Sequence, residues 1–188
     1  MLTVTIKAIT AAYISLSYQV TNTDATDIYV ADLLYLIAAD GSQAVEPTLG
    51  YVMPVADGTL YTGKFLMRIP EGLKVESPDL PYFRRLGPGQ TLTGEIQLAN
   101  PAHPYHPYTS YRLGDQPLPV HRIVMQIGII RGMDLKPGEG TLRPARQMNP
   151  DYFVPDYGFG LQYQTILESQ VQISQPGAGY YPVLSVAR

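Results

Sequence analysis

Two histidines three positions apart form the most site-like pattern in the chain. His103 and His106 lie in the run His-Pro-Tyr-His, and paired imidazoles are common among metal ligands. A third ligand would have to come from Asp115, His121 or an acidic residue elsewhere. No Cys, Glu or helical frame accompanies the pair, so the pattern favours the alternative, a proline- and tyrosine-rich surface loop with two exposed histidines. His103 and His106 are therefore the candidate metal ligands to test.

Oxygen ligands of the kind that calcium prefers cluster near the end of the second expected strand. Asn22, Asp24 and Asp27 fall within six residues. The run lacks the glycine at the sixth position and the glutamate at the twelfth that an EF-hand loop requires. Asn and Asp side chains also bond their own backbone in turns, and this simpler interpretation explains all three residues.

Paired carboxylates in an aromatic segment raise the question of sugar chemistry. Asp151 and Asp156 are the type of pair that a glycosidase uses, and Tyr152, Tyr157 and Phe159 could stack on sugar rings. The chain has no tryptophan, the expected platform for carbohydrate. The alternative is that both aspartates begin turns next to prolines.

Sequence signatures of covalent catalysis and of phosphate binding are missing. The chain contains no GxSxG or SxxK motif, and Gly138-Glu139-Gly140 lacks the rest of a phosphate-binding loop. Arg84 and Arg85 would either grip an anion or form a solvated pair beside a buried aromatic residue. The expectation is a protein that is not an enzyme and needs no cofactor.

Tyrosine is unusually frequent, with 15 residues, and many of them gather in two long segments without strand alternation, 99–119 and 131–160. Tyrosine offers a large, stiff contact area and a hydroxyl group at a wet rim. A proline-stiffened tyrosine loop is therefore typical of a binding surface, although these rings can also cover a small core within the loop. The candidate binding residues are Tyr105, Tyr108, Tyr111, Tyr152, Phe153 and Tyr157.

Composition restricts the class of protein that holds these residues. The 17 glycines and 17 prolines are too many for a helical bundle and suit short strands joined by turns. Net charge is −3 with no basic stripe, which argues against nucleic acid as a partner. No apolar stretch is long enough to span a membrane. The start of the chain has no signal-peptide pattern, so a cytoplasmic location is the expectation, unless a leader preceded this sequence.

Alternation of apolar and polar residues is the main structural signal. Ile14, Leu16, Tyr18 and Val20 would share one buried face of a strand, and Ile123 to Ile129 repeat the pattern. Seven strands are expected in all, over residues 2–6, 13–20, 28–38, 59–69, 92–98, 123–131 and 161–173.

Turn chemistry and one capping signal complete the prediction. The second and third strands would form a hairpin or a corner between two sheets, and Asp40-Gly41 predicts a tight turn. Ser77 and Pro78 can begin a short helical turn over residues 78–85. The chain is expected to be one domain, 1–188, with segments 99–119 and 131–160 as long ordered loops.

An alternating strand that ends at Asn22, together with the entry Leu86-Gly87-Pro88-Gly89-Gln90 into a later strand, resembles bacterial immunoglobulin-like domains. The resemblance covers about a third of the chain and carries no site with it. It implies an all-β, immunoglobulin-like, two-sheet antiparallel sandwich.

The leading hypothesis is a non-enzymatic interaction or structural module that presents its long loops to a protein partner or to another copy of itself. A small-molecule ligand is not expected. The alternative is a carbohydrate- or metal-binding sandwich. A concave pocket with convergent polar groups would instead favour an enzyme.

Overall fold

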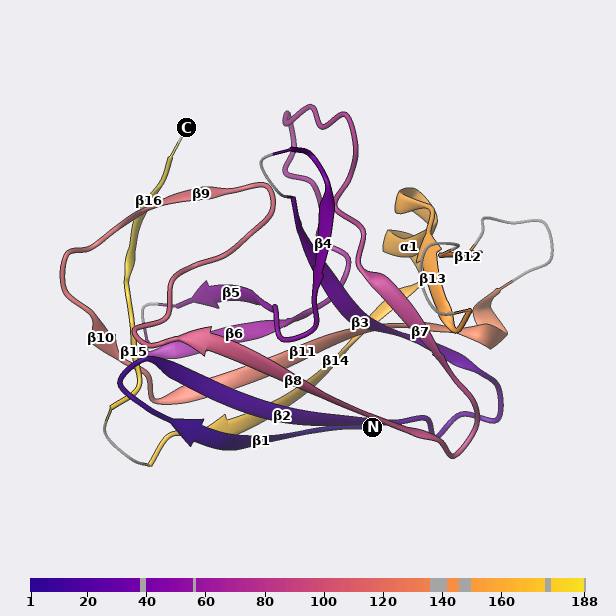
Figure 1. Ribbon diagram of the computed structural model, residues 1–188, viewed down its shortest axis with the longest axis horizontal. Coiled ribbons are helices and arrows are strands. Elements are labelled where there is room, and N and C mark those ends of the chain that lie inside the picture. Colours follow the sequence, from indigo (N-terminus) through magenta and orange to yellow (C-terminus); the bar gives the residue numbers. More distant parts are fainter. Residues whose placement is uncertain (38–39, 56, 136–141, 146–149, 175–176, 188) are drawn as a thin grey trace.

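Strands are the main elements of the protein, and they lie in two facing sheets with smaller ribbons at one end (Figure 1). The computed structural model describes residues 1–187 apart from 38–39, 56, 136–141, 146–149 and 175–176. Within these residues no helix is long and apolar enough to cross a membrane. The all-β prediction is confirmed, and the immunoglobulin-like relationship stays a prediction.

The smaller main sheet has three antiparallel strands in the order β1-β2-β8. Its strands are β1 (Leu2–Ile9), β2 (Tyr13–Thr21) and β8 (Thr91–Ala99). The central strand β2 alternates as its sequence predicts, because Ile14, Leu16, Tyr18 and Val20 are all buried. One face of this sheet therefore points into the core and the other points to solvent.

The larger sheet follows the order β12-β13-β7-β3-β11-β6-β5, with β14 paired to β11 and β4 paired to β3. Its bounds are β3 (Ile28–Ile37), β4 (Gln43–Glu46), β5 (Tyr51–Pro54), β6 (Thr59–Lys64), β7 (Tyr82–Leu86), β11 (Arg122–Arg131), β12 (Leu142–Pro144), β13 (Tyr152–Pro155) and β14 (Gln164–Gln172). The strands β2 and β3 lie in different sheets, so the segment between them is a corner and not a hairpin.

Short ribbons and helical turns occupy the rest of the described chain. The strand β9 (Ser110–Leu113) pairs with β16 (Val183–Ala187), and β10 (Leu118–Pro119) pairs with β15 (Gly179–Tyr180). The helical elements are the 3₁₀ turn η1 (Gly132–Asp134) and the helix α1 (Tyr157–Tyr163).

The main core lies between the two large sheets. Ile123, Met125, Ile127 and Ile129 of β11 are buried with the inner face of β2 and with Ile96 and Leu98 of β8. The seven predicted strands correspond to β1, β2, β3, β6, β8, β11 and β14. Their period-2 patterns located them because each has one face in this core.

Three expectations about local structure are wrong. The predicted helical turn over 78–85 is absent, and Tyr82–Leu86 forms strand β7 instead, because Phe83 and Leu86 are buried where β7 pairs with β3. The predicted strand 161–173 begins only at Gln164, since Tyr157–Tyr163 is helical. The pairing of β6 with β11 is parallel, unlike the antiparallel arrangement expected.

The two long segments contain short strands and helical turns where the structure describes them. Segment 99–119 contains β9 and β10, and segment 131–160 contains η1, β12, β13 and part of α1. Residues 136–141 and 146–149 lie outside the described residues. In the described part of both segments, short strands replace much of the expected irregular structure.

The sheet divides along one edge of β11. Residues Arg122–Ile127 of that edge pair with β6, whereas Ile129–Arg131 pair with β3. The strands β3 and β6 therefore diverge near Gly128, and Lys64 at the end of β6 lies in the division. Its ammonium group donates to the backbone oxygens of Asp32 at 2.8 Å and Pro47 at 2.6 Å.

Candidate functional site

A cavity of about 890 Å³ opens where the β3–β4 hairpin, the segment before β7 and the segment before β9 meet. The hairpin and the segment before β7 project together from the sandwich at the top of Figure 1. We call this space the tyrosine cavity, after the Tyr35, Tyr105 and Tyr108 side chains that line it around Asp79. A cavity of this size and lining is typical of a ligand or peptide site.

The backbone places the tyrosine rings from three distant parts of the sequence. Tyr35 comes from β3, and Tyr105 is fixed by two hydrogen bonds to Val52 of β5, each 2.9 Å between nitrogen and oxygen. Tyr51, also in β5, is fully buried beneath the cavity, and its ring stacks on Tyr105 with centroids 6.0 Å apart. The walls are therefore anchored to the larger sheet.

Tyrosine hydroxyl groups hold the segment that carries Asp79. The Asp79 backbone N–H donates to the Tyr108 hydroxyl oxygen at 2.7 Å, and the Leu80 N–H donates to the Tyr35 hydroxyl oxygen at 3.4 Å. These contacts place the Tyr35 and Tyr108 hydroxyl groups beside the Asp79–Leu80 backbone. The segment that carries Asp79 is therefore held in part through its backbone.

Burial disfavours the charge on Asp79. Loss of solvent raises the pKa of the Asp79 carboxyl above its ordinary value, and the Tyr35 and Tyr51 hydroxyl groups offset part of this rise. The Tyr51 hydroxyl is fully buried and has no other hydrogen-bond partner among the described residues. The cavity therefore holds a partly buried carboxylate beside tyrosine hydroxyl groups.

Exposed aliphatic side chains surround the mouth of the cavity. Leu36, Ile37 and Leu73 are 44 %, 72 % and 45 % exposed, and all three line the tyrosine cavity. Three large aliphatic side chains at the rim of one cavity are typical of a surface that a partner covers.

The two candidate metal ligands lie in different environments. The His106 imidazole lines the tyrosine cavity, accepts the Tyr108 N–H on Nδ1 at 3.1 Å, and has a pKa lowered by burial. His103 is exposed beside Tyr181, with ring centroids 4.7 Å apart. Among the described residues, no group of three or more His, Cys, Asp or Glu is arranged to hold a metal ion.

The predicted binding residues do not form one surface. Tyr105 and Tyr108 line the tyrosine cavity, whereas Tyr111 lies in β9. Phe153 packs edge-on against Tyr29, with centroids 5.1 Å apart, and the Tyr157 hydroxyl accepts the Ile69 N–H at 2.6 Å. Tyr152 bonds to the buried Asp32. The binding role of all six residues stays a prediction.

Two important residues of the cavity were missed from the sequence. Asp79 falls within the predicted helical turn over residues 78–85, and no pattern in the sequence distinguishes Tyr51 from the other tyrosines. The available signal was an acidic residue set between prolines in the run Ser-Pro-Asp-Leu-Pro. That signal alone does not indicate which tyrosines surround the carboxyl.

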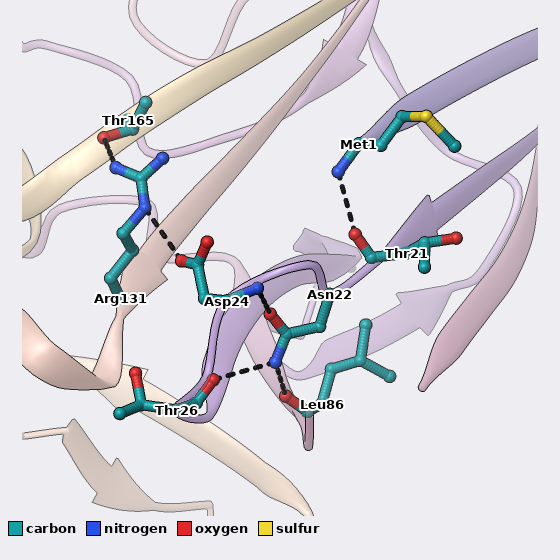
Figure 2. Close-up of polar contacts among 8 residues, drawn as sticks. All are labelled: Met1, Thr21, Asn22, Asp24, Thr26, Leu86, Arg131 and Thr165. Atoms are coloured by element: carbon teal, nitrogen blue, oxygen red, sulfur yellow. Dashed lines mark hydrogen bonds and ion pairs between the residues drawn. The ribbon is translucent and has the colours of Figure 1, made fainter. Parts of the chain in front are cut away.

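Turn chemistry accounts for the calcium candidates (Figure 2). The Asn22 side chain donates to the Thr26 and Leu86 backbone oxygens and accepts the Asp24 N–H, each at 2.9 Å. The carboxylate of Asp24 pairs with Arg131 at 3.0 Å. These contacts join Asn22 to the entry into β8, so the two segments that carry the immunoglobulin-like resemblance are in direct contact.

The sugar-site candidates are also engaged elsewhere. Asp156 forms an ion pair with Arg143, and Phe159 is buried in a small core with Ala31, Phe83 and Ile130. A ring buried in this way has no face free to stack on a sugar.

A second polar cluster lies inside the protein, around the division between β3 and β6. The Asp32 carboxylate accepts hydrogen bonds from the Tyr152 hydroxyl at 2.7 Å and from the Tyr18 hydroxyl at 3.4 Å. The Lys64 ammonium lies 5.4 Å from the centre of the Tyr18 ring. Burial lowers the pKa of Lys64 to about 8, and Asp32 opposes this change. We call these four residues the internal cluster; Lys64 is only 1 % exposed, too enclosed to meet a ligand.

The internal cluster predicts an unusual dependence of stability on pH. The folded pKa of Lys64, about 8, is below the ordinary 10.5, so between these values the unfolded chain binds more protons and stability rises with pH. Tyr18 and Tyr152 have raised pKa values through burial and Asp32, so stability falls once unfolded tyrosines ionise. The unfolding free energy should rise by about 1 kcal/mol up to about pH 9 and fall above about pH 10.

Urea unfolding at a series of pH values checks this dependence. Lys64→Met should abolish the rise and leave the fall at high pH. A wild-type stability that only declines from neutral pH upward would contradict the prediction.

Comparisons of the chain with protein-family models, with curated proteins and with solved structures found no match. The fold and the site define a sandwich-like all-β protein with a tyrosine-lined cavity at the end of its larger sheet. Its function is therefore inferred from this cavity.

Proposed function

We propose that this chain is a non-enzymatic protein-interaction module whose recognition surface is the tyrosine cavity and its aliphatic rim. The observation that carries the proposal is the coincidence of exposed Leu36, Ile37 and Leu73 with a cavity lined by tyrosine. Tyrosine is enriched among the residues that contribute most of the free energy of protein interfaces, and exposed apolar patches mark interaction sites.

The occupant that fits best is a segment of another protein that lays apolar side chains on the rim and inserts one side chain. The floor is acidic at Asp79, and the lining as a whole has two acidic residues against one lysine. Charge complementarity therefore favours a partner segment with a basic residue between apolar ones.

The polar groups of the cavity favour recognition over catalysis. His106 is the strongest candidate for a general base, but its Nδ1 already accepts the Tyr108 N–H. Among the described residues, no serine or threonine hydroxyl group of the lining is hydrogen-bonded to this imidazole.

Rim substitutions test the proposal. A photo-crosslinking residue is placed at Leu73, and at Met133 as a control that is 67 % exposed but outside the cavity. Crosslinking in a lysate of the source organism should join a partner at position 73 and not at 133. Ile37→Ser should reduce the yield at position 73 by about tenfold, whereas Leu118→Ser, an exposed aliphatic residue outside the cavity, should leave it unchanged.

Equal crosslinking at positions 73 and 133, or a yield that Ile37→Ser does not change, would contradict the proposal. A product that joins two copies of this chain would replace the foreign partner with self-association. Circular dichroism of each variant establishes that the fold is retained.

A further inference from the structure

The environment of the Asp79 carboxylate favours contact with a cation over contact with water. Asp79 interacts electrostatically or through hydrogen bonds with four tyrosine side chains: Tyr35, Tyr51, Tyr105 and Tyr108. Three of these rings line the cavity beside the carboxyl, and the fourth lies buried below. A carboxylate beside tyrosine hydroxyl oxygens offers a positively charged donor an anion and further acceptors.

The segment that carries Asp79 is held partly through its backbone N–H groups. The Tyr108 and Tyr35 hydroxyl groups anchor the backbone N–H groups of Asp79 and Leu80. Burial also raises the pKa of the carboxyl, so the ionised group costs stability in the unoccupied cavity. A partly buried carboxyl group with a shifted pKa that lines a cavity is a candidate for ligand binding.

We propose that the tyrosine cavity receives an alkylammonium group, the end of a lysine side chain of the protein partner, with Asp79 as its counter-ion. This inference rests on the proposed binding function of the same cavity. It adds the chemistry of the inserted group and the residue that recognises it.

An ammonium group fits this floor better than a guanidinium group. Tyr35 and Tyr51 already stabilise the Asp79 carboxylate, so the two parallel hydrogen bonds that arginine prefers have less room. Lysine acts as a compact point charge with rotatable donors and can bond the carboxylate and a tyrosine oxygen together.

The other charged groups of the lining do not oppose this assignment. Glu76 adds negative charge and is exposed, and Lys74 is exposed as well. The pKa of His106 is lowered by burial, so this imidazole is neutral near pH 7 and leaves the acidic floor uncompensated.

The test uses n-butylammonium chloride, an analogue of the lysine side chain, with the full-length chain labelled with ¹⁵N. Amide shifts at Asp79, Tyr105 and Tyr108 should move and saturate with a dissociation constant of about 10 mM, as expected for a single small cation. The neutral analogue N-butylacetamide and sodium chloride at equal ionic strength should not produce these shifts.

Two isosteric variants remove one negative charge each from the cavity lining. Asp79→Asn should weaken n-butylammonium binding by about tenfold, while its melting temperature stays equal to wild type or rises. Glu76→Gln removes the same charge from an exposed position and should change the dissociation constant by less than about twofold.

Equal weakening by the two variants, or saturation by the neutral analogue, would overturn the assignment of Asp79. Rim-specific crosslinking without n-butylammonium binding would retain the interaction module and reject the ammonium site. Binding of n-butylammonium with no rim-specific crosslink would keep the cation site and reject the protein partner, leaving a receptor for small amines.

Discussion

Replacing Asp32 with alanine is expected to lower the free energy of unfolding by about 3–5 kcal/mol, because it leaves two tyrosine hydroxyl groups without their acceptor and removes a negative charge near the buried Lys64. The Asp32 carboxylate is 6 % exposed and accepts the hydroxyl groups of Tyr18 and Tyr152. It also opposes the fall in the pKa of Lys64. Alanine supplies no acceptor to either hydroxyl group and no negative charge to Lys64.

Urea unfolding followed by circular dichroism measures this loss, since the chain has no tryptophan. The matched control is Glu95→Ala, which breaks an ion pair with Lys7 whose side chains are 46 % and 50 % exposed. That change should cost less than about 1 kcal/mol. Equal losses in the two variants would show that the internal cluster contributes no more than a surface pair.

A double variant separates the charge from the hydrogen bonds. In the Asp32→Ala background, Lys64→Met should lower the free energy of unfolding by less than it does in the wild-type protein. The reason is that the Lys64 ammonium group has already lost the nearby negative charge of Asp32. Additive losses would mean that Asp32 acts only through the two tyrosine hydroxyl groups.

Gly63→Ala is expected to lower the free energy of unfolding by about 3 kcal/mol or more, because a methyl group has no space between two paired strands. Gly63 of β6 is paired with Gln126 of β11 in the parallel ladder. A Cβ atom at this position would overlap the Gln126 carbonyl oxygen and lie 2.7 Å from its carbonyl carbon. Both contacts are backbone, so the strands would have to separate next to Lys64.

Gly158→Ala is the matched control for this substitution. Gly158 lies in α1, and a Cβ there would meet no atom within 4 Å. The change should be neutral or stabilise the protein by up to about 1 kcal/mol, since alanine is the better helix former. Thermal unfolding compares the two variants, and a Gly63→Ala protein as stable as wild type would contradict the parallel register.

Local patterns in the sequence located the long strands correctly because each of them has one face in the core. The alternation of Ile14, Leu16, Tyr18 and Val20 predicted β2, and all four are buried. The same pattern placed Leu161 and Tyr163 on a strand, where the chain instead forms α1. The short strands β7 and β13 gave no clear period, because too few residues alternate and pairing with β3 and with each other holds them in place.

The tyrosine cavity could be predicted only in part. Tyr105 and Tyr108 were recognised as binding candidates from their proline-rich segment. Tyr35, Tyr51 and Asp79 join them only because β3, β5 and the segment before β7 meet at one end of the larger sheet. No pattern in the local sequence around these residues indicates that the three segments come together.

The sequence by itself determined that the chain folds as strands, which faces of the long strands are buried, and where the tight turn at Asp40 falls. These properties depend on neighbours within a few residues, and so they appear in composition and period. The tertiary structure decided the parallel β6–β11 pairing, the internal cluster around Asp32 and the carboxylate within tyrosine walls. These features join residues from different strands and loops, such as Asp32 with Lys64 and with Tyr152, and contacts of this kind follow from which strands pair and not from any local pattern.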